Sequence, residues 1–235
     1  MMSTEIIILA GGLGTRIKPV LGDTPKCLAP IGEQPFLHYL IHYFQSQGIQ
    51  KFVFSLGHGH TEIETYLNSY KEPLDYMICK EETPLGTGGA VLNALRFTSL
   101  PSVWVANGDS FLSASLDPMA AFFDMCGAEC VVALAEVKDT ARYGSVQLAT
   151  DYKVTGFAEK GNAGKGWINA GIYLLNKRLF TAHEWPERFS FEQDYLNAYC
   201  AAARFFGYRY RNYFIDIGVP EDLQKAQNEL IRYAT

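Results

Sequence analysis

The chain has 235 residues, of which 48% are hydrophobic and 19% charged, so a packed core is expected rather than disorder. The formal net charge of −5 at pH 7 argues against a general nucleic-acid binder, because such proteins usually carry a basic surplus. No apolar run approaches the roughly 20 residues that cross a bilayer, the N-terminus has no basic region typical of a signal peptide, and the five cysteines show no disulfide framework. We therefore expect a cytoplasmic protein that has free thiols and binds neither membrane nor nucleic acid, with a single domain over residues 1–235.

The first half of the chain alternates strand and helix signals. Continuous apolar or β-branched runs predict strands at Ile6–Leu9, Lys51–Leu56, Asp75–Lys80 and Ser102–Ala106. Helices are predicted at Phe36–Phe44, Thr61–Tyr70 and Thr87–Arg96, with a further one starting at Asp117. Thr61 and Glu64 have the spacing of a capping box, and Asp117-Pro118 predicts a capped start with a first-turn proline. This βα series predicts a largely parallel sheet with helices on both faces.

The second half has more strands and fewer helices. Strands are predicted at Glu129–Glu136, Ser145–Ala149, Val154–Ala158 and Trp167–Leu175, with a hairpin turn at Asp151–Lys153. Helices return at Phe191–Ala203 and Pro220–Tyr233, and the aromatic residues between them alternate as in a late strand. We expect an α/β protein, a three-layer α/β/α sandwich whose central sheet is mostly parallel but mixed.

A glycine-rich segment, residues 11–16 with the sequence GGLGTR, follows the first strand. Its glycines let the backbone approach a ligand and turn N–H groups toward an anion, although a tight strand-to-helix turn would read the same way. It is not a dinucleotide fingerprint, because Ile17 stands where the third glycine belongs, and it lacks the lysine of a P-loop. Arg16 and Lys26 could neutralise a polyphosphate from two sides.

The glycine-rich segment followed by Pro25-Lys26 resembles the signature of the sugar-1-phosphate nucleotidyltransferases, and the similarity extends from Ile6 to about Leu230. These enzymes join a nucleoside triphosphate to a sugar 1-phosphate and release pyrophosphate. The resemblance implies the Rossmann-like fold of nucleotide-diphospho-sugar transferases. The sequence has no hexapeptide repeat, so no β-helix domain is expected. By analogy with relatives, a homodimer is possible.

The resemblance implies that two loops bind the nucleotide. The second loop, residues 82–90 with the sequence ETPLGTGGA, is similar to the loop that contacts the base and the sugar in the family. Taken alone, it would be a strand-to-helix connection with closely packed glycines. The residues expected to bind the nucleotide are Leu9, Ala10, Gly11, Gly12, Gly14, Thr15, Arg16, Glu82, Pro84, Leu85, Gly86 and Thr87.

Asp109 and Asp216 each follow an apolar run at a predicted strand end, where ligands gather in open α/β sheets, although either could cap a turn instead. The resemblance implies that the two carboxylates hold the catalytic Mg²⁺. Unpartnered carboxylates about 4 Å apart would repel by roughly 4 kcal/mol at an effective dielectric of 20, and a divalent cation reverses the sign.

The histidines and cysteines predict no second metal site. His58 and His60 have no cysteine pair at zinc-ligand spacing. Cys27, which stands where the family usually has proline, is expected to have some thiolate character beside Lys26. Cys126 and Cys130 are expected to be two buried thiols.

The resemblance also implies a half-site for the sugar phosphate. A glutamate at 159 suits hydroxyl donors and a lysine at 160 suits a dianion, although the pair alone would be solvated charges. The expected sugar-phosphate-binding residues are Lys26, Gly108, Tyr143, Gly144, Glu159, Lys160, Asn169, Gly171 and Glu192. The expected catalytic residues are Arg16, Lys26, Asp109, Asp216 and Lys160.

Within the family, the chain most resembles the guanylyltransferases that act on D-glycero-α-D-manno-heptose 1-phosphate. The similar segments are residues 84–90, 142–146, 168–175, 189–192 and 213–222. The expected reaction is an in-line attack by the sugar phosphate on the α-phosphate of GTP, which needs no general base. Mannose 1-phosphate, or glucose 1-phosphate with another nucleoside triphosphate, remain alternative substrates, and a regulatory module that binds a nucleotide sugar is the non-enzymatic alternative.

Overall fold

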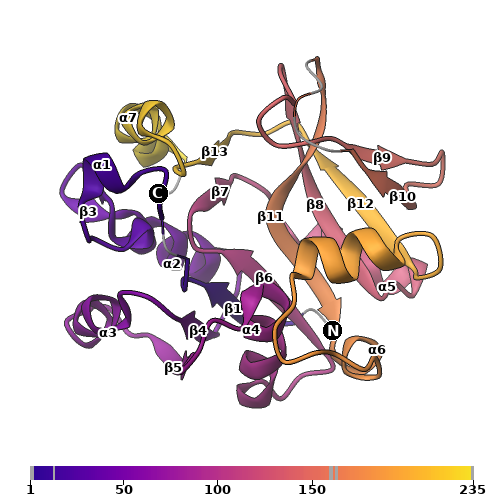
Figure 1. Cartoon of the computed structure of the whole chain (residues 1–235), viewed down its shortest axis with the longest axis horizontal. Helices are drawn as coiled ribbons and strands as arrows, with labels where there is room; N and C mark the ends of the chain where they lie inside the picture. The colour runs from indigo at the N-terminus through magenta and orange to yellow at the C-terminus, as the bar shows by residue number, and fades with distance from the viewer. Residues whose placement is uncertain (1–2, 13, 159–160, 162–163, 234–235) are drawn as a thin grey trace.

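The structure, a computed structural model, describes residues 3–12, 14–158, 161 and 164–233. Its centre is a seven-stranded sheet with the strand order β12-β8-β11-β6-β1-β4-β5 (Figure 1). These strands are β1 (Glu5–Leu9), β4 (Lys51–Leu56), β5 (Asp75–Lys80), β6 (Ser102–Asn107), β8 (Cys130–Val137), β11 (Gly166–Asn176) and β12 (Phe205–Tyr210). All neighbours are parallel except at β11, which runs antiparallel to β6 and β8. The predicted mostly parallel, mixed sheet is confirmed.

Shorter ladders and helices complete the chain. The two-stranded ladders pair β2 (Pro30–Ile31) with β3 (Gln34–Pro35), β7 (Ser110–Leu112) with β13 (Phe214–Asp216), and β9 (Val146–Leu148) with β10 (Val154–Phe157). The α-helices are α1 (Lys18–Leu21), α2 (Phe36–Ser46), α3 (His60–Asn68), α4 (Gly86–Ala94), α5 (Leu116–Cys126), α6 (Lys177–Thr181) and α7 (Pro220–Glu229). The 3₁₀ turns are η1 (Lys26–Leu28), η2 (Leu95–Phe97) and η4 (Leu230–Arg232), and η3 (Phe191–Asn197) is a π-helix.

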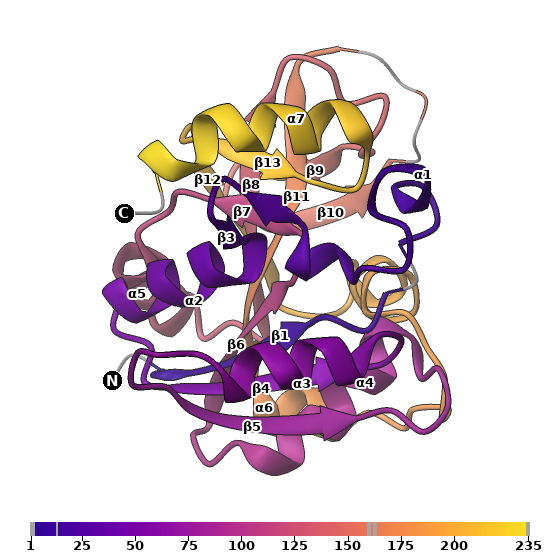
Figure 2. The same ribbon diagram turned by 90° about the vertical axis from the view of Figure 1, so that its left-hand side faces the viewer.

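Two hydrophobic clusters on opposite faces of the sheet make the three layers. Successive residues of a strand point to opposite faces, so Ile6 and Ile8 of β1 pack with α2, α3, α5 and α7, whereas Ile7 packs with α4, α6 and η3. β1 is therefore buried on both faces, as its continuous apolar run predicts. The C-terminal helix α7 covers the N-terminal β2–β3 hairpin (Figure 2), where the Gln227 side chain donates to the Pro30 carbonyl at 3.4 Å.

Three predicted helix boundaries were wrong. α3 begins after Gly59, which is left-handed at φ +73°, and no side chain caps it. Glu64 instead binds Lys80 at 2.7 Å and His60 at 3.1 Å, so the capping box does not form. α5 begins after the extended Ser115, which places Asp117 inside the first turn. The helix predicted over residues 191–203 is a π-helix as far as Asn197, continues helically through Ala198 and Tyr199, and ends before the turn at residues 200–202 that leads to β12.

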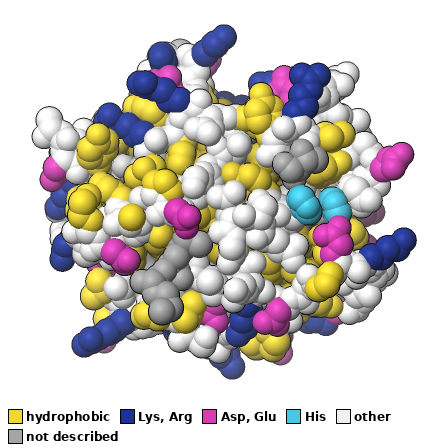
Figure 3. Space-filling view, turned by 180° about the vertical axis from the view of Figure 1, so that it is seen from behind, with side chains coloured by type: hydrophobic (Ala, Val, Ile, Leu, Met, Phe, Trp, Pro, Cys, Tyr) yellow, Lys and Arg dark blue, Asp and Glu magenta, His cyan; other side chains and the backbone are white. Residues whose placement is uncertain are grey.

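The cysteines are free thiols. Cys130 is fully buried in β8, but Cys126 is only half-buried because it ends α5, so the prediction of two buried thiols was right for one of them. Within the described ranges, no helix is long and apolar enough to cross a membrane. On the face in Figure 3, lysine and arginine side chains are scattered among acidic ones, without the basic stripe of a nucleic-acid surface.

Candidate active site

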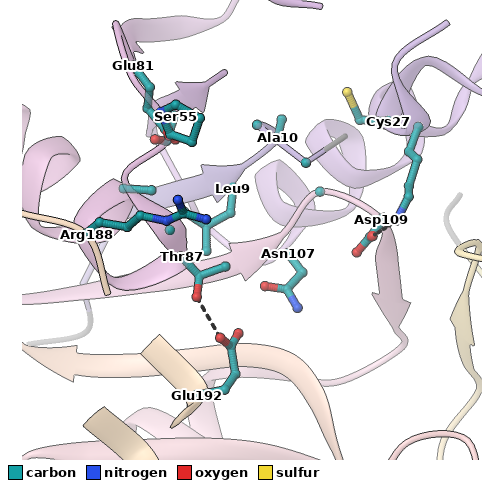
Figure 4. A pocket seen from close by; sticks show the side chains of 17 residues that line it. Leu9, Ala10, Cys27, Ser55, Glu81, Thr87, Asn107, Asp109, Arg188 and Glu192 are labelled. Carbon is teal, nitrogen blue, oxygen red and sulfur yellow. Dashed lines mark hydrogen bonds and ion pairs between the residues drawn. The ribbon is translucent and has the colours of Figure 1, made fainter. Parts of the chain in front are cut away.

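A cavity of about 330 Å³ opens at the carboxyl ends of β1, β4 and β6, where parallel sheets bind ligands (Figure 4). Eleven of the residues around it are sequence-predicted site residues. These are Leu9, Ala10, Gly11, Gly12, Lys26, Pro84, Gly86, Thr87, Gly108, Asp109 and Glu192. They come from several elements far apart in the sequence, which the sheet brings to one edge.

Two glycines allow the strand ends to approach one another under this cavity. The Gly108 N–H donates to the Leu9 carbonyl at 2.9 Å, and a methyl group added at Gly108 would lie 2.8 Å from that oxygen. A methyl group at Gly11 would lie 2.9 Å from the Gly57 nitrogen. Any side chain at either position would force β1 away from its neighbours, so these glycines shape the floor of the cavity.

Lys26 and Asp109, which both line the cavity, form an ion pair with 2.9 Å between Nζ and Oδ2. Figure 4 shows Asp109 on the side of the cavity away from Glu81. Lys26 lies in the η1 turn after Pro25, and Asp109 lies between β6 and β7. Burial, and then the charge of Asp109, raise the pKa of Cys27 to about 12. The expected thiolate character of Cys27 was therefore wrong, because the thiol stays neutral at physiological pH.

The β7–β13 ladder brings Asp216 to Asp109 from more than 100 residues away. Asp216 pairs with Ser110, and the Ile217 N–H donates to the Asp109 carbonyl at 3.0 Å. Burial, followed by the negative charge of Asp109, raises the pKa of Asp216. Lys26 beside Asp109 and Arg142, 3.8 Å from Asp216 Oδ2, offset part of the negative charge of the two carboxylates, and a divalent cation would offset more of it.

Arg142 anchors the Asp216 segment. Its guanidinium donates to the Asp216 carbonyl at 3.3 Å and forms an ion pair with Asp222. It also lies 4.6 Å over the ring of Tyr143, which packs edge-on against Phe214 of β13. The sequence-predicted Tyr143 therefore lies beside the Asp216 strand and outside the cavity wall.

The start of α4 is tied to the π-helix η3 through one side chain. Thr87 donates its hydroxyl to Glu192 Oε2 at 2.6 Å and accepts the Phe191 N–H at 2.9 Å (Figure 4). Ser190 donates a further hydrogen bond to Glu192 at 3.2 Å. The Glu192 carboxylate is thereby fixed at the cavity wall, in a rare helix type that often occurs at functional sites.

Other sequence-predicted residues lie around the cavity or away from it. Arg16 is exposed, and its Nη2 would lie 3.4 Å from a methyl group at Gly218, two residues after Asp216. Gly14 and Thr15 do not line the cavity, and neither does Gly144. Glu82 and Leu85 face a neighbouring groove beside η2. Glu159 and Lys160 lie outside the described residues.

Asn169 and Gly171 form a bulge in β11 next to the cavity. Asn169 Oδ1 accepts the Gly171 N–H at 2.9 Å, and the pairing of β11 with β8 shifts register at this point. Gly171 is left-handed at φ +75°, and a methyl group there would lie 2.8 Å from the Asn107 side chain. The bulge thus packs against Asn107, which lines the cavity.

Six cavity residues were absent from the sequence-predicted set: Cys27, Ser55, Glu81, Ala90, Asn107 and Arg188. Ser55 is the last residue but one of β4 and Glu81 follows β5, so the rule that ligands gather at strand ends could have found them. Arg188 lies in the segment between α6 and η3, where no motif in the sequence marked it.

The nucleotidyl transferase family matches residues 5–232, and the chain belongs to that family. Its fold is that of a nucleotidyltransferase. The D-glycero-alpha-D-manno-heptose 1-phosphate guanylyltransferase of Aneurinibacillus thermoaerophilus is 41% identical over 97% of this chain and 99% of that protein. The protein of the same name from Campylobacter jejuni is 36% identical over 93% of this chain and 96% of that protein.

A solved structure agrees with these relatives. The crystal structure of HddC from Yersinia pseudotuberculosis complexed with GMP-PN superposes with a TM-score of 0.86 at 35% identity. The match covers 96% of this chain and 99% of that one. The Rossmann-like nucleotidyltransferase fold is thereby confirmed.

Proposed function

We propose that this enzyme transfers GMP from GTP to D-glycero-α-D-manno-heptose 1-phosphate, producing the GDP-heptose and pyrophosphate. The observation that carries the proposal is the 41% identity, over nearly the full length of both chains, to a guanylyltransferase of that specificity. The cavity supports it, because Lys26 and Asp109 stand together at a strand-end site. Five free thiols suit a reducing compartment, so we propose a cytoplasmic location.

In the proposed reaction, a phosphate oxygen of the heptose 1-phosphate attacks the α-phosphorus of GTP and the bond to the β,γ-pyrophosphate breaks. The attacking monoester is already ionised near neutral pH, so no side chain has to remove a proton. Lys26 neutralises the α-phosphate or the incoming sugar phosphate, and Arg16 holds the β- and γ-phosphates. Lys160 is proposed to bind the attacking phosphate. Positioning and charge stabilisation then account for the rate.

The residues at the phosphate end fit a divalent cation such as Mg²⁺. Asp109 and Asp216 are held side by side, and the raised pKa of Asp216 reflects burial and then repulsion by Asp109. Among the described residues, no group of three or more histidine, cysteine or acidic side chains could hold a metal. This suits Mg²⁺, which commonly uses one or two carboxylates plus substrate phosphates and water. When bound, the ion would offset the charge on the triphosphate.

The proposal is tested by measuring pyrophosphate release from the purified protein with Mg²⁺. GTP, ATP, CTP, UTP and dTTP are each combined with the heptose, mannose and glucose 1-phosphates. We expect release that depends on both GTP and the heptose phosphate. Preference for another pair would overturn the proposed substrates, and no release from any pair would overturn the proposed activity.

A further inference from the structure

A buried carboxylate lies at the end of the sheet opposite the cavity. Glu129 directly precedes β8, which runs in the same direction as β6, so it lies at the amino end of these strands. The residue is 9% exposed. Its N–H donates to the Arg204 carbonyl at 3.0 Å, and its carbonyl accepts the Asn176 N–H at 2.8 Å. The proposed reaction gives this well-fixed carboxylate no role.

One oxygen of this carboxylate binds two side chains from one stretch of chain. Glu129 Oε1 accepts the Tyr195 hydroxyl at 2.8 Å and lies 3.0 Å from His183 Nε2. Since a carboxylate accepts hydrogen bonds and donates none, His183 presents its Nε2–H to it. Tyr195 is fully buried. The carboxylate therefore holds both ends of residues 183–195, which we call the wall segment.

The middle of the wall segment reaches the cavity. Arg188 and Glu192 both line the cavity (Figure 4). Phe189, between them, pairs with the start of α4: its N–H donates to the Leu85 carbonyl and its carbonyl accepts the Gly88 N–H, both at 3.0 Å. The wall segment thus runs from the amino end of the sheet to the cavity and back, with its two ends fixed far from the substrates.

Aromatic packing buries the wall segment without fixing its position. Trp185 stacks on Phe189 with 4.5 Å between ring centroids, and Tyr195 packs edge-on against Phe180 and Phe205. Hydrophobic contact is non-directional, so these rings alone do not specify one placement along the sheet. Hydrogen bonds to a buried carboxylate are directional, and a satisfied polar network specifies one arrangement. Because burying a carboxylate costs free energy that an apolar side chain would not, packing alone does not account for this residue type.

We propose that Glu129 is a positioning residue, which holds the wall segment at both ends and thereby fixes Arg188 and Glu192 at the cavity. The kinetic consequence rests on the proposed function, in which Glu192 binds the sugar phosphate. A displacement of about 1 Å at a group that positions substrate can cost on the order of 10²-fold in rate. A small shift of the wall segment would therefore impair use of the sugar phosphate.

The first test removes one contact without changing the shape of the side chain. Tyr195→Phe deletes the hydroxyl that Glu129 binds. We expect kcat/KM for the heptose 1-phosphate, at saturating GTP, to fall by about tenfold or more. Tyr210→Phe is the matched control, because it deletes a hydroxyl that donates to the Ser115 carbonyl at 2.7 Å in the other hydrophobic cluster. It is expected to keep the wild-type value.

Two changes at Glu129 separate its hydrogen bonds from its size. Glu129→Gln keeps an oxygen that can accept from both Tyr195 and His183, so it should keep most of kcat/KM. Glu129→Met has a similar length but no oxygen acceptor, and should lower kcat/KM at least as much as Tyr195→Phe. Thermal unfolding establishes that each variant is folded at the assay temperature. If Glu129→Gln is as impaired as Glu129→Met, the segment is not held by these hydrogen bonds, and the proposal is overturned.

A double-mutant cycle with Glu192→Gln distinguishes positioning from a general structural role. Residues that act through one network are not additive. Tyr195→Phe should therefore lower kcat/KM by a clearly smaller factor in the Glu192→Gln enzyme than in the wild type. The same factor in both enzymes would mean that Tyr195 acts independently of Glu192, which contradicts the proposal.

Hydrogen exchange measures the placement of the wall segment without any activity. The Gly88 and Phe189 amide protons join this segment to α4, and they should exchange faster in Glu129→Met and Tyr195→Phe than in Tyr210→Phe or the wild type. Unchanged exchange overturns the positioning role. A wild type that does not use GTP and the heptose 1-phosphate overturns the proposed function, and exchange then still decides the role of Glu129. In an active enzyme, a wild-type kcat/KM for Tyr195→Phe overturns that role alone.

Discussion

Among single residues, Asp216 lies in surroundings that disfavour its ionised form. Its pKa is raised from the ordinary value of 3.8 by burial and then by Asp109. The folded state therefore holds this proton more tightly than the unfolded state. The stabilisation is fully present below the unfolded pKa and is lost as pH rises through the higher folded pKa.

Asp216→Asn should remove this pH-dependent loss. Without divalent cations, we expect the melting temperature of the variant, relative to wild type, to rise as pH increases from about 4 toward 7. Differential scanning fluorimetry across this range measures it. The control is Asp124→Asn, at an exposed position on α5, which should show no such trend. A difference in melting temperature between the variant and the wild type that does not change with pH would contradict our assignment of the raised pKa of Asp216 to burial and to the charge of Asp109.

Arg16 is a second residue at which charge should decide function. We propose that it neutralises the leaving pyrophosphate, so Arg16→Ala should lower turnover by about 10²-fold or more, or roughly 3 kcal/mol. Steady-state pyrophosphate release measures the change. Arg178→Ala, at an exposed position on α6, is the matched control. Near-normal turnover of Arg16→Ala would remove this residue from the mechanism.

Two adjacent glutamates at the start of the expected nucleotide loop face different pockets. Of the loop residues expected to bind the nucleotide, Pro84, Gly86 and Thr87 line the cavity, whereas Glu82 faces the neighbouring groove and Glu81, just before the loop, lines the cavity. Neighbouring side chains leave a strand end in opposite directions, so a shift of one residue moves a carboxylate from one pocket to another. Two adjacent glutamates in a sequence do not reveal which one faces inward.

At the level of elements, the contact between α4 and η3 fixes the cavity wall. Thr87→Val keeps the shape of this side chain but removes both hydrogen bonds that its hydroxyl makes. We expect a loss of about 2 kcal/mol in the free energy of unfolding, together with a lower kcat/KM for the sugar phosphate because Glu192 loses a restraint. Urea unfolding and steady-state kinetics measure the two effects.

Thr87→Ser is the informative control for this contact, because it restores the hydroxyl. Recovery of both stability and kcat/KM in Thr87→Ser is expected. If Thr87→Ser is as impaired as Thr87→Val, restoring the hydroxyl does not restore the wall, which would contradict the assignment of the effect to the two hydrogen bonds.

Elements were predictable where local pattern decides them. β4 and β5 have the predicted bounds, because each contains a short apolar run between polar residues, although β4 is buried and β5, at the sheet edge, is largely exposed or half-buried. The end of α3 nearest Gly59 was not predictable, because Glu64 binds Lys80 of a neighbouring strand and leaves the helix start uncapped. The π-helix at residues 191–197 was read as an ordinary helix, because its sequence carries no distinct period.

On the scale of the whole molecule, the site depends on pairing between distant segments. The β7–β13 ladder joins Asp109 to Asp216, and residue spacing alone could not show that these strands pair. The resemblance to the family supplied that pairing. The general rule that ligands gather at strand ends predicted at which edge of the sheet the site lies, but not which distant segments pair there.

We propose that residues 1–235 unfold as one domain. Both hydrophobic clusters share the strands of a single sheet, so neither can melt without exposing the other. Differential scanning calorimetry should show one transition with equal calorimetric and van't Hoff enthalpies. Two resolved transitions, or a calorimetric enthalpy well above the van't Hoff value, would contradict a single cooperative unit. The homodimer implied by relatives stays a prediction for light scattering to test.

The most direct test of guanylyl transfer follows the α-phosphate itself. GTP labelled at the α-phosphorus is incubated with the enzyme, Mg²⁺ and D-glycero-α-D-manno-heptose 1-phosphate, and the products are separated. We predict that the label appears in GDP-heptose, in equal amount to the pyrophosphate released, and only when the sugar phosphate is present. Label recovered as GMP, or left in GTP bound to the protein, would contradict transfer and indicate hydrolysis or binding alone.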